Sequence, residues 1–240
     1  MEKGILLLRL IEWRKKMKIA LLGSTGFLGK VLLEQALKRG FRIKTLVRMP
    51  DKLGEFKDRI ECIQGSLNDT EKLDQTVNGT DAVVSVVGPP QRNPGPPEFY
   101  AKIMQELVTI LEKNKIKRFI HTGGAAHLGG KYEKWTIGRR ILRAFLIVFG
   151  KPILIAKERE WMVLKQSNLD WTLVRPPHIV TGEPAGHVSA NEKKLFKTNV
   201  NVEDLANFIL DQIASREWIK RAPLVSSGNS NGQINTHNCS

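Results

Sequence analysis

The stretch Lys18-Ile-Ala-Leu-Leu-Gly-Ser-Thr-Gly-Phe-Leu-Gly29 decides the fold, because an apolar run of strand length leads directly into three glycines. Gly23, Gly26 and Gly29 have the spacing G-x-x-G-x-x-G, and apolar residues at helical intervals follow them. In such a turn the first glycine ends the strand, the second lets the backbone approach a pyrophosphate, and the third lets the helix pack closely on the sheet. The N-terminus of that helix faces the anion. The stretch therefore predicts a dinucleotide-binding loop rather than an ordinary connection.

The composition is that of one globular domain, with 240 residues of which 41% are hydrophobic and 26% charged. Only two cysteines are present, Cys62 and Cys239, which favours a reducing cytoplasm over a disulfide-stabilised secreted protein. The formal net charge of +14 would suit a nucleic acid or an anionic membrane. The basic residues are nevertheless spread along the chain without a helix-turn-helix, zinc or aromatic RNA-binding signature. We therefore expect a cytoplasmic protein that does not bind nucleic acid.

The domain is expected over residues 17–225, between two segments of different composition. Residues 1–16 combine a short apolar run with several charges, and are too short and too charged for a signal peptide or a membrane span. They are either an added helix or sequence that precedes the true start of the domain at Met17. Residues 226–240 are rich in Ser, Asn and Gly, and predict a disordered polar tail.

Between these ends, short apolar runs alternate with amphipathic segments. Strands are expected at Lys18–Leu22, Arg42–Val47, Ile60–Ile63, Ala82–Val87, Arg118–His121 and Trp171–Val174. Helices are expected at Gly26–Arg39, Thr70–Val77, Glu98–Asn114, Ile155–Ser167 and Val202–Ser215. Strands without polar alternation, separated by helices, are typical of a parallel sheet covered on both faces. With right-handed crossovers they predict an α/β fold with a doubly wound parallel sheet, the Rossmann fold, in a single domain.

Ligands of such sheets lie beyond the carboxyl ends of the strands, so the residues that follow each strand are candidates for the site. Arg48 and Lys52 follow the second strand, where an acidic residue would bind the ribose hydroxyls of NAD. Two cations there favour the 2′-phosphate, and therefore NADP(H) over NAD(H). The other candidates for cofactor binding are Gly23, Ser24, Thr25, Gly26, Phe27, Leu28 and Gly29 in the loop, and Ser66, Leu67, Val87, Gly88, Pro89, Thr122, Gly123, Pro177, His178 and Ile179 after later strands.

Four segments together resemble the atypical short-chain dehydrogenase/reductase families: Gly-Ser-Thr-Gly-Phe-Leu-Gly, Thr-Leu-Val-Arg, Gly-Ser-Leu-Asn-Asp and Asp170-Trp-Thr-Leu-Val-Arg-Pro-Pro177. The similarity is greatest to the NmrA-like proteins and to the flavin reductase (biliverdin-IXβ reductase) group. This resemblance implies NADPH binding by the positions named above. It also implies that Lys157 binds the cofactor near the nicotinamide, together with His178 and Thr122 in orienting roles, and that Glu160 is a structural glutamate.

The sequence departs from the standard short-chain reductases at their catalytic pair. Those enzymes use Tyr-x-x-x-Lys, in which the lysine lowers the tyrosine pKa so that the phenol can exchange a proton with the substrate. Met104 follows Tyr100 at that spacing, and Thr136 follows Tyr132. Gly123 also stands where a catalytic serine is expected. The carbonyl-reducing constellation is therefore absent from the sequence, and no catalytic residue is assigned from the spacing.

Two classes of function fit these observations. The first is an NADPH-dependent reductase that transfers hydride to a flavin, a quinone or a similar small acceptor, which needs little help with proton transfer. The second is a non-catalytic NADP(H)-binding redox sensor of the NmrA type. The resemblance of Pro176-Pro-His-Ile179 to the flavin reductase group favours the enzyme. The oligomeric state is not indicated by the sequence.

Residues 134–151 place three arginines beside Phe145-Leu-Ile-Val-Phe149. This segment is a helix that packs its apolar side on the domain, a flap over the substrate site, or a basic amphipathic surface that makes weak contact with anionic lipid. No transmembrane segment is expected. The histidines lack metal-ligand spacing with carboxylates or cysteines, so no metal site is expected either.

Overall fold

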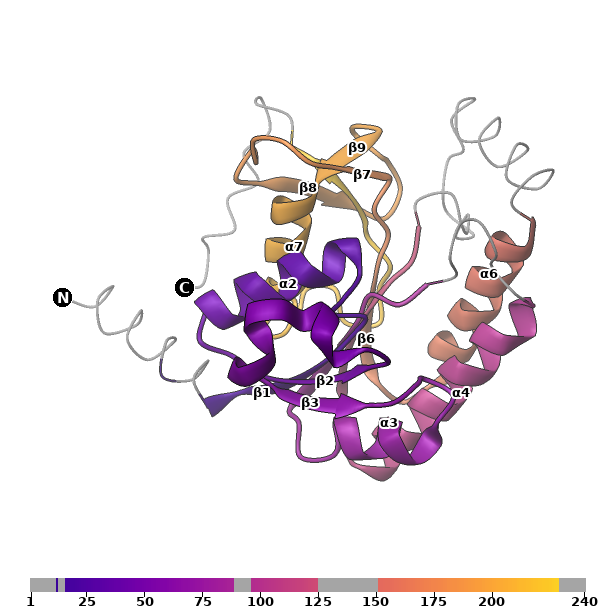
Figure 1. Ribbon diagram of the computed structural model, residues 1–240. Helices are drawn as coiled ribbons and strands as arrows, with labels where there is room; N and C mark the ends of the chain where they lie inside the picture. The colour runs from indigo at the N-terminus through magenta and orange to yellow at the C-terminus, as the bar shows by residue number, and fades with distance from the viewer. Residues whose placement is uncertain (1–11, 13–15, 89–95, 125–150, 229–240) are drawn as a thin grey trace.

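Six parallel strands form the central sheet, in the order β3-β2-β1-β4-β5-β6 (Figure 1). They are β1 (Lys18–Leu22), β2 (Arg42–Val47), β3 (Glu61–Gln64), β4 (Ala82–Ser85), β5 (Arg118–Thr122) and β6 (Asp170–Val174). The computed structural model describes residues 12, 16–88, 96–124 and 151–228. From β1 the chain adds β2 and β3 on one side and then β4, β5 and β6 on the other, so the strand order reverses between β1 and β4. This is the doubly wound arrangement predicted from the sequence, and ligands bind beyond the strands at such a reversal.

Helices cover both faces of the sheet. They are α2 (Phe27–Lys38), α3 (Thr70–Val77), α4 (Pro97–Lys113), α6 (Lys151–Gln166) and α7 (Val202–Asp211). Successive side chains of a strand point to opposite faces, so Ile19 and Leu21 of β1 pack with α2 and α7, whereas Ala20 and Leu22 pack with α3, α4 and α6. Figure 1 shows these two helical layers on either side of the strands. The uninterrupted apolar runs in the sequence therefore fill two separate cores.

The glycine loop joins β1 to α2 through two positions that only glycine suits. Gly23 has φ 92°, in the left-handed region that side chains disfavour. A Cβ atom at Gly29 would lie 1.9 Å from the carbonyl oxygen of Gly23, so no side chain fits between the helix and the strand end. The tight turn and the close helix packing predicted from the glycine spacing are therefore both observed.

Five elements were not expected from the sequence. The 3₁₀ segment η1 (Pro50–Arg59) follows β2, and the short strands β7 (His178–Val180), β8 (Val188–Asn191), β9 (Asn199–Asn201) and β10 (Leu224–Ser227) follow β6. β10 pairs antiparallel with β8, and β7 pairs parallel with β9. These strands form two small sheets that lie above the central one, around α7 (Figure 1).

The expected start of the polar tail at Ser226 is wrong by at least two residues. β10 runs through Ser227, and Ser226 is only 1% exposed. Its hydroxyl accepts a hydrogen bond from the backbone N–H of Lys197 at 3.2 Å, so this serine belongs to the folded domain although its neighbours in sequence are polar. The remainder of the expected tail from residue 229, nearly all of the N-terminal segment 1–16, and residues 134–150 lie outside the described residues.

Other boundaries differ by a few residues. β4 ends at Ser85 rather than Val87, although the Val86 N–H still donates to the carbonyl of Leu22 at 3.0 Å. α6 begins at Lys151, ahead of the expected Ile155. Within the described parts of the chain, no helix combines the length and the apolar character needed to cross a membrane.

Candidate functional site

A cavity of about 260 Å³ lies at the carboxyl ends of β1 to β4, where the strand order reverses. Residues predicted from the sequence line much of it: Gly23, Thr25, Arg48, Ser66, Leu67, Val87 and Gly88. The remaining lining residues are Leu46, Val47, Gly65, Phe99, Tyr100 and Ile103. The fold therefore brings together residues from four strand ends and one helix that are far apart in the sequence.

The N-terminus of α2 faces this loop without a side-chain cap. Its N-cap residue is Gly26, and its first turn contains no acidic residue. Two other helices are capped by their own side chains, since Asp69 accepts from an α3 amide and Asn201 accepts from two α7 amides. The first amides of a helix have no partner inside the helix, so those of α2 remain available to an external anion such as a pyrophosphate.

The side chain of Ser24 braces the loop instead of facing the cavity. It is fully buried, and its Oγ lies 2.7 Å from Oγ1 of Thr45, which in turn donates to the carbonyl of Leu21 at 2.7 Å. The predicted residues Phe27, Leu28 and Gly29 also do not line the cavity. A phosphate contact by these four positions can therefore come only from their backbone amides.

Of the two cations predicted for the 2′-phosphate, only Arg48 reaches the cavity. Arg48 is exposed directly after β2 and lines the cavity. Lys52 is exposed within η1 and is not among the lining residues. None of the described residues that line the cavity is an aspartate or a glutamate, so no lining side chain offsets the positive charge of Arg48.

The aromatic residues at the start of α4 were missed in the sequence. The rings of Phe99 and Tyr100 pack edge to face, with their centroids 5.3 Å apart, and both residues line the cavity. Burial raises the pKa of Tyr100, the Glu160 carboxylate adds to the rise, and Arg48 opposes it, so the phenol stays protonated at neutral pH. The available signal was that α4 follows β4, which places its N-terminus at the same edge of the sheet as the strand ends.

A buried polar network lies at the other end of the cavity, behind Gly88. Lys157 Nζ is 2.8 Å from Glu160 Oε2, and this oxygen is 3.2 Å from Nε2 of His121. The side chains are 12%, 6% and 3% exposed respectively. Lys157 Nζ also donates to the carbonyls of Val87 at 3.4 Å and Thr122 at 3.5 Å. The ammonium group therefore bridges the ends of β4 and β5, where the predicted nicotinamide would lie.

The charges of this network follow from burial and mutual contact. Burial alone would raise the pKa of Glu160, but Lys157 and the His121 contact lower it below its usual value. Burial lowers the pKa of His121, and Lys157 lowers it further, against the opposing effect of Glu160. At neutral pH the carboxylate is thus ionised and the imidazole is neutral. Because an ionised carboxylate can only accept, His121 Nε2 carries the proton between them.

The remaining residues predicted from the sequence either form no hydrogen bond with Lys157 among the described residues or form hydrogen bonds through their backbone groups. His178 is exposed at the start of β7, and its backbone N–H donates to the carbonyl of Thr198 at 3.2 Å. Pro177 and Ile179, beside it, do not line the cavity. Thr122 is buried, with its hydroxyl 3.5 Å from the carbonyl of Ser85.

The amide of Gly123 donates to the carbonyl of Val174 at 2.8 Å, which joins the ends of β5 and β6. Pro89 and Tyr132 lie outside the described residues. The structure therefore joins Lys157 to Thr122 by a hydrogen bond, and within the described parts of the chain no hydrogen bond joins His178 to either of them.

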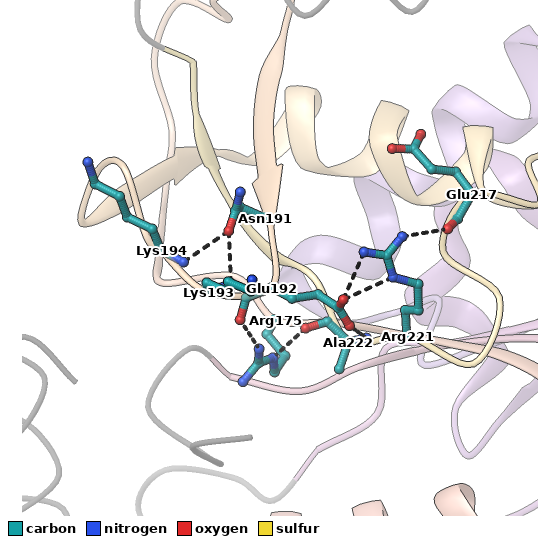
Figure 2. Close-up of polar contacts among 8 residues, drawn as sticks. All are labelled: Arg175, Asn191, Glu192, Lys193, Lys194, Glu217, Arg221 and Ala222. Atoms are coloured by element: carbon teal, nitrogen blue, oxygen red, sulfur yellow. Dashed lines mark hydrogen bonds and ion pairs between the residues drawn. The ribbon is translucent and has the colours of Figure 1, made fainter. Parts of the chain in front are cut away.

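Arg175, in the Arg-Pro-Pro stretch that follows β6, has a structural contact that the sequence did not reveal. It is 3% exposed, and it donates to the carbonyl of Ala222 at 2.8 Å and to that of Glu192 at 3.5 Å (Figure 2). Arg175 therefore connects the end of β6 to the residues that adjoin β8 and β10 in the small C-terminal sheet.

Comparison with known proteins gives a family and several relatives. Residues 23–216 match the NAD(P)H-binding family. Anthocyanidin reductase of Arabidopsis thaliana is 24% identical over 187 residues, and the alignment covers 66% of this chain but only 54% of the plant protein. A short-chain dehydrogenase/reductase of Veillonella parvula, solved with NADP, has a TM-score of 0.72 at 17% identity and covers 90% of this chain and 97% of its own.

The anaerobillin reductase ChuY of Escherichia coli O157:H7 has a TM-score of 0.72 at 16% identity, covering 90% of this chain and 100% of its own. At these identities the two solved structures establish the shared fold. The family match extends over most of the described domain, from the glycine loop to the residues after α7. It confirms the NAD(P)H-binding resemblance seen in the sequence motifs, and the chain belongs to the NAD(P)H-binding family.

Proposed function

We propose that the protein is an NADPH-dependent reductase that transfers hydride to a flavin, a quinone or a similar small acceptor. The observation that carries this proposal is the buried Lys157–Glu160–His121 network at the end of the cofactor cavity. Buried charges are costly, and perturbed ionisable groups in a cleft are typical of functional sites. An ammonium group where the nicotinamide is expected favours an enzyme over a protein that only binds the cofactor.

The cofactor itself is supported by three features of the cavity. The uncapped amides of α2 would bind the pyrophosphate, and the small residues of the glycine loop leave room for it. Arg48 would pair with a 2′-phosphate, and no described carboxylate lines the cavity to bind the ribose hydroxyls of NAD instead. This favours NADPH over NADH. The dihydronicotinamide ring of the bound cofactor would supply the hydride.

Lys157 would act on the acceptor through its fixed positive charge. Glu160 and the two strand-end carbonyls hold the ammonium group beside Gly88, where a Cβ atom would lie only 3.4 Å from Nζ. Because this position has no side chain, the charge lies close to the cavity. It would stabilise the negative charge that develops on an acceptor as hydride arrives. A flavin or quinone can then take its protons from solvent, which fits a site without a tyrosine–lysine pair.

The test is steady-state oxidation of NADPH with a panel of flavins, quinones and simple aldehydes. We expect turnover with a flavin or quinone and little with aldehydes, since carbonyl reduction gains about 10²–10⁴-fold from a positioned proton donor. NADPH binding measured by calorimetry accompanies the assay. Tight binding without turnover of any acceptor would contradict the reductase and support the redox sensor instead.

A further inference from the structure

The loop between β8 and β9, residues 192–198, presents lysines around an exposed aromatic ring; we call it the lysine loop. Lys193, Lys194 and Lys197 are exposed, and Phe196 is 40% exposed. Lys194 Nζ lies 5.3 Å from the centre of the Phe196 ring. The loop therefore places an exposed aromatic ring directly among exposed cations.

The acidic residue of the lysine loop does not offset these charges. Glu192 is paired with Arg221: its Oε2 is 2.8 Å from Nη2 and 2.9 Å from Nε of that arginine (Figure 2). Its Oε1 accepts from the backbone N–H of Ala222 at 3.3 Å. Figure 2 shows the Lys194 side chain extending away from this cluster. Glu217 joins the cluster only through its backbone carbonyl, which accepts a hydrogen bond from Arg221 at 3.3 Å. The outward surface of the loop therefore carries lysine charges without a carboxylate of its own.

The backbone of the loop is held at both ends. Asn191 Oδ1 accepts from the backbone N–H groups of Lys193 at 2.8 Å and Lys194 at 3.1 Å. At the other end, the Lys197 N–H donates to Ser226 at 3.2 Å, and the carbonyl of Thr198 accepts from His178 at 3.2 Å. A loop fixed in this way loses little conformational entropy when a surface binds to it.

We propose that the lysine loop docks the protein on an anionic lipid bilayer. Lys193, Lys194 and Lys197 would contact the negative headgroups, while Phe196 enters the boundary between headgroups and acyl chains. A bilayer uses both properties of the loop, because lysines extend their charges to headgroup level and an aromatic ring is favoured at that interface. The net charge of +14 adds long-range attraction to such a surface. This inference does not rest on the reductase proposal.

The test is co-sedimentation of the full chain with vesicles of phosphatidylcholine and phosphatidylserine, and with phosphatidylcholine alone, at about 0.15 M salt. We expect binding to the anionic vesicles and none to the neutral ones. The variant Lys193→Gln/Lys194→Gln/Lys197→Gln should lose about 100-fold in partition coefficient, since each lysine near an anionic surface contributes roughly fivefold. Phe196→Ser should weaken binding to the same vesicles several-fold.

The matched control removes the same charge from exposed lysines elsewhere, in Lys102→Gln/Lys117→Gln/Lys165→Gln. It should bind within a few-fold of the parent, and thermal melts check that every variant is folded. Three results would each overturn the proposal: no binding of the parent to anionic vesicles, an equal loss in the control triple variant, or unchanged binding of Phe196→Ser. Binding of single-stranded RNA through these lysines, without vesicle binding, would replace the bilayer with a nucleic acid.

Discussion

Arg48 lines the cavity where we propose that the adenosine of the cofactor binds, whereas Lys52 is not among the lining residues. Charge-assisted hydrogen bonds are worth about 1.5–3 kcal/mol, or about 10- to 150-fold in affinity. We therefore predict that Arg48→Ala loses most of the preference for NADPH while its affinity for NADH changes little. Lys52→Ala is the matched control and should keep the preference. Calorimetric titration of both cofactors measures this, and equal affinities of the parent protein for the two cofactors would refute it.

His121 gives the stability of the fold a predictable pH dependence. Its pKa in the folded protein is below the ordinary 6.5, so below that pH the unfolded chain binds a proton that the folded chain does not. Stability should then fall as the pH is lowered from 7 toward 5, with a slope of up to about 1.4 kcal/mol per pH unit from this group. The variant His121→Gln keeps a donor for Glu160 but does not titrate, so it should flatten that slope.

Urea unfolding at a series of pH values measures the slope. The exposed His178→Gln is the control, and it should retain the slope of the parent. If His121→Gln and the parent lose stability in parallel between pH 7 and 5, the imidazole is not held neutral in the folded protein.

Substitutions at two glycines of the loop should have different effects, one on cofactor binding and the other on folding. Gly26 has φ −77°, which any residue adopts, and a Cβ there would meet only the Gly23 carbonyl oxygen, at 3.3 Å. A Cβ at Gly29 would lie 1.9 Å from that same oxygen. We predict that Gly26→Val folds but loses NADPH, because its side chain occupies the space of the pyrophosphate, whereas Gly29→Ala is strongly destabilised. Thermal melts and calorimetry distinguish them, and a well-folded Gly26→Val that still binds NADPH would place the phosphates elsewhere.

The elements that the sequence predicted well are those with local signals. β1 and β2 have the expected bounds, and α3 begins at Thr70, directly after its N-cap Asp69. Apolar periodicity and helix capping depend on residues close together in the sequence, so they can be recognised there. β7 and β9 have three residues each, and they exist only because they pair with each other across the chain. No local pattern reveals such a pairing.

The residues of the candidate site also fall into those that the sequence could indicate and those that it could not. Arg48, Ser66, Leu67 and Gly88, predicted from the strand ends to bind the cofactor, all line the cavity, since a parallel sheet gathers its strand ends at one edge. Their binding of the cofactor stays a prediction. The sequence could not show that Ser24 turns inward, because its partner Thr45 lies on another strand.

At the scale of the whole molecule, the two ends of the cavity have different electrostatic character. One end has the exposed guanidinium of Arg48 and two aromatic rings, and the opposite end has a buried ammonium held by a carboxylate and two carbonyls. These groups come from β2, α4 and α6, which only the doubly wound topology brings to one edge. We therefore propose that one end of the cavity selects the cofactor and that hydride transfer takes place at the other.

The role proposed for Lys157 is tested by comparing NADPH oxidation, with the best quinone or flavin acceptor, between the parent and Lys157→Met/Glu160→Gln. The double substitution removes both charges, so no unpaired carboxylate is left buried to unfold the protein. We predict that the variant binds NADPH as the parent does but turns over about 10²-fold more slowly, the usual cost of losing one preorganised charge. Turnover equal to that of the parent, or no turnover by a parent that binds NADPH, would contradict the assignment of hydride transfer to this end of the cavity.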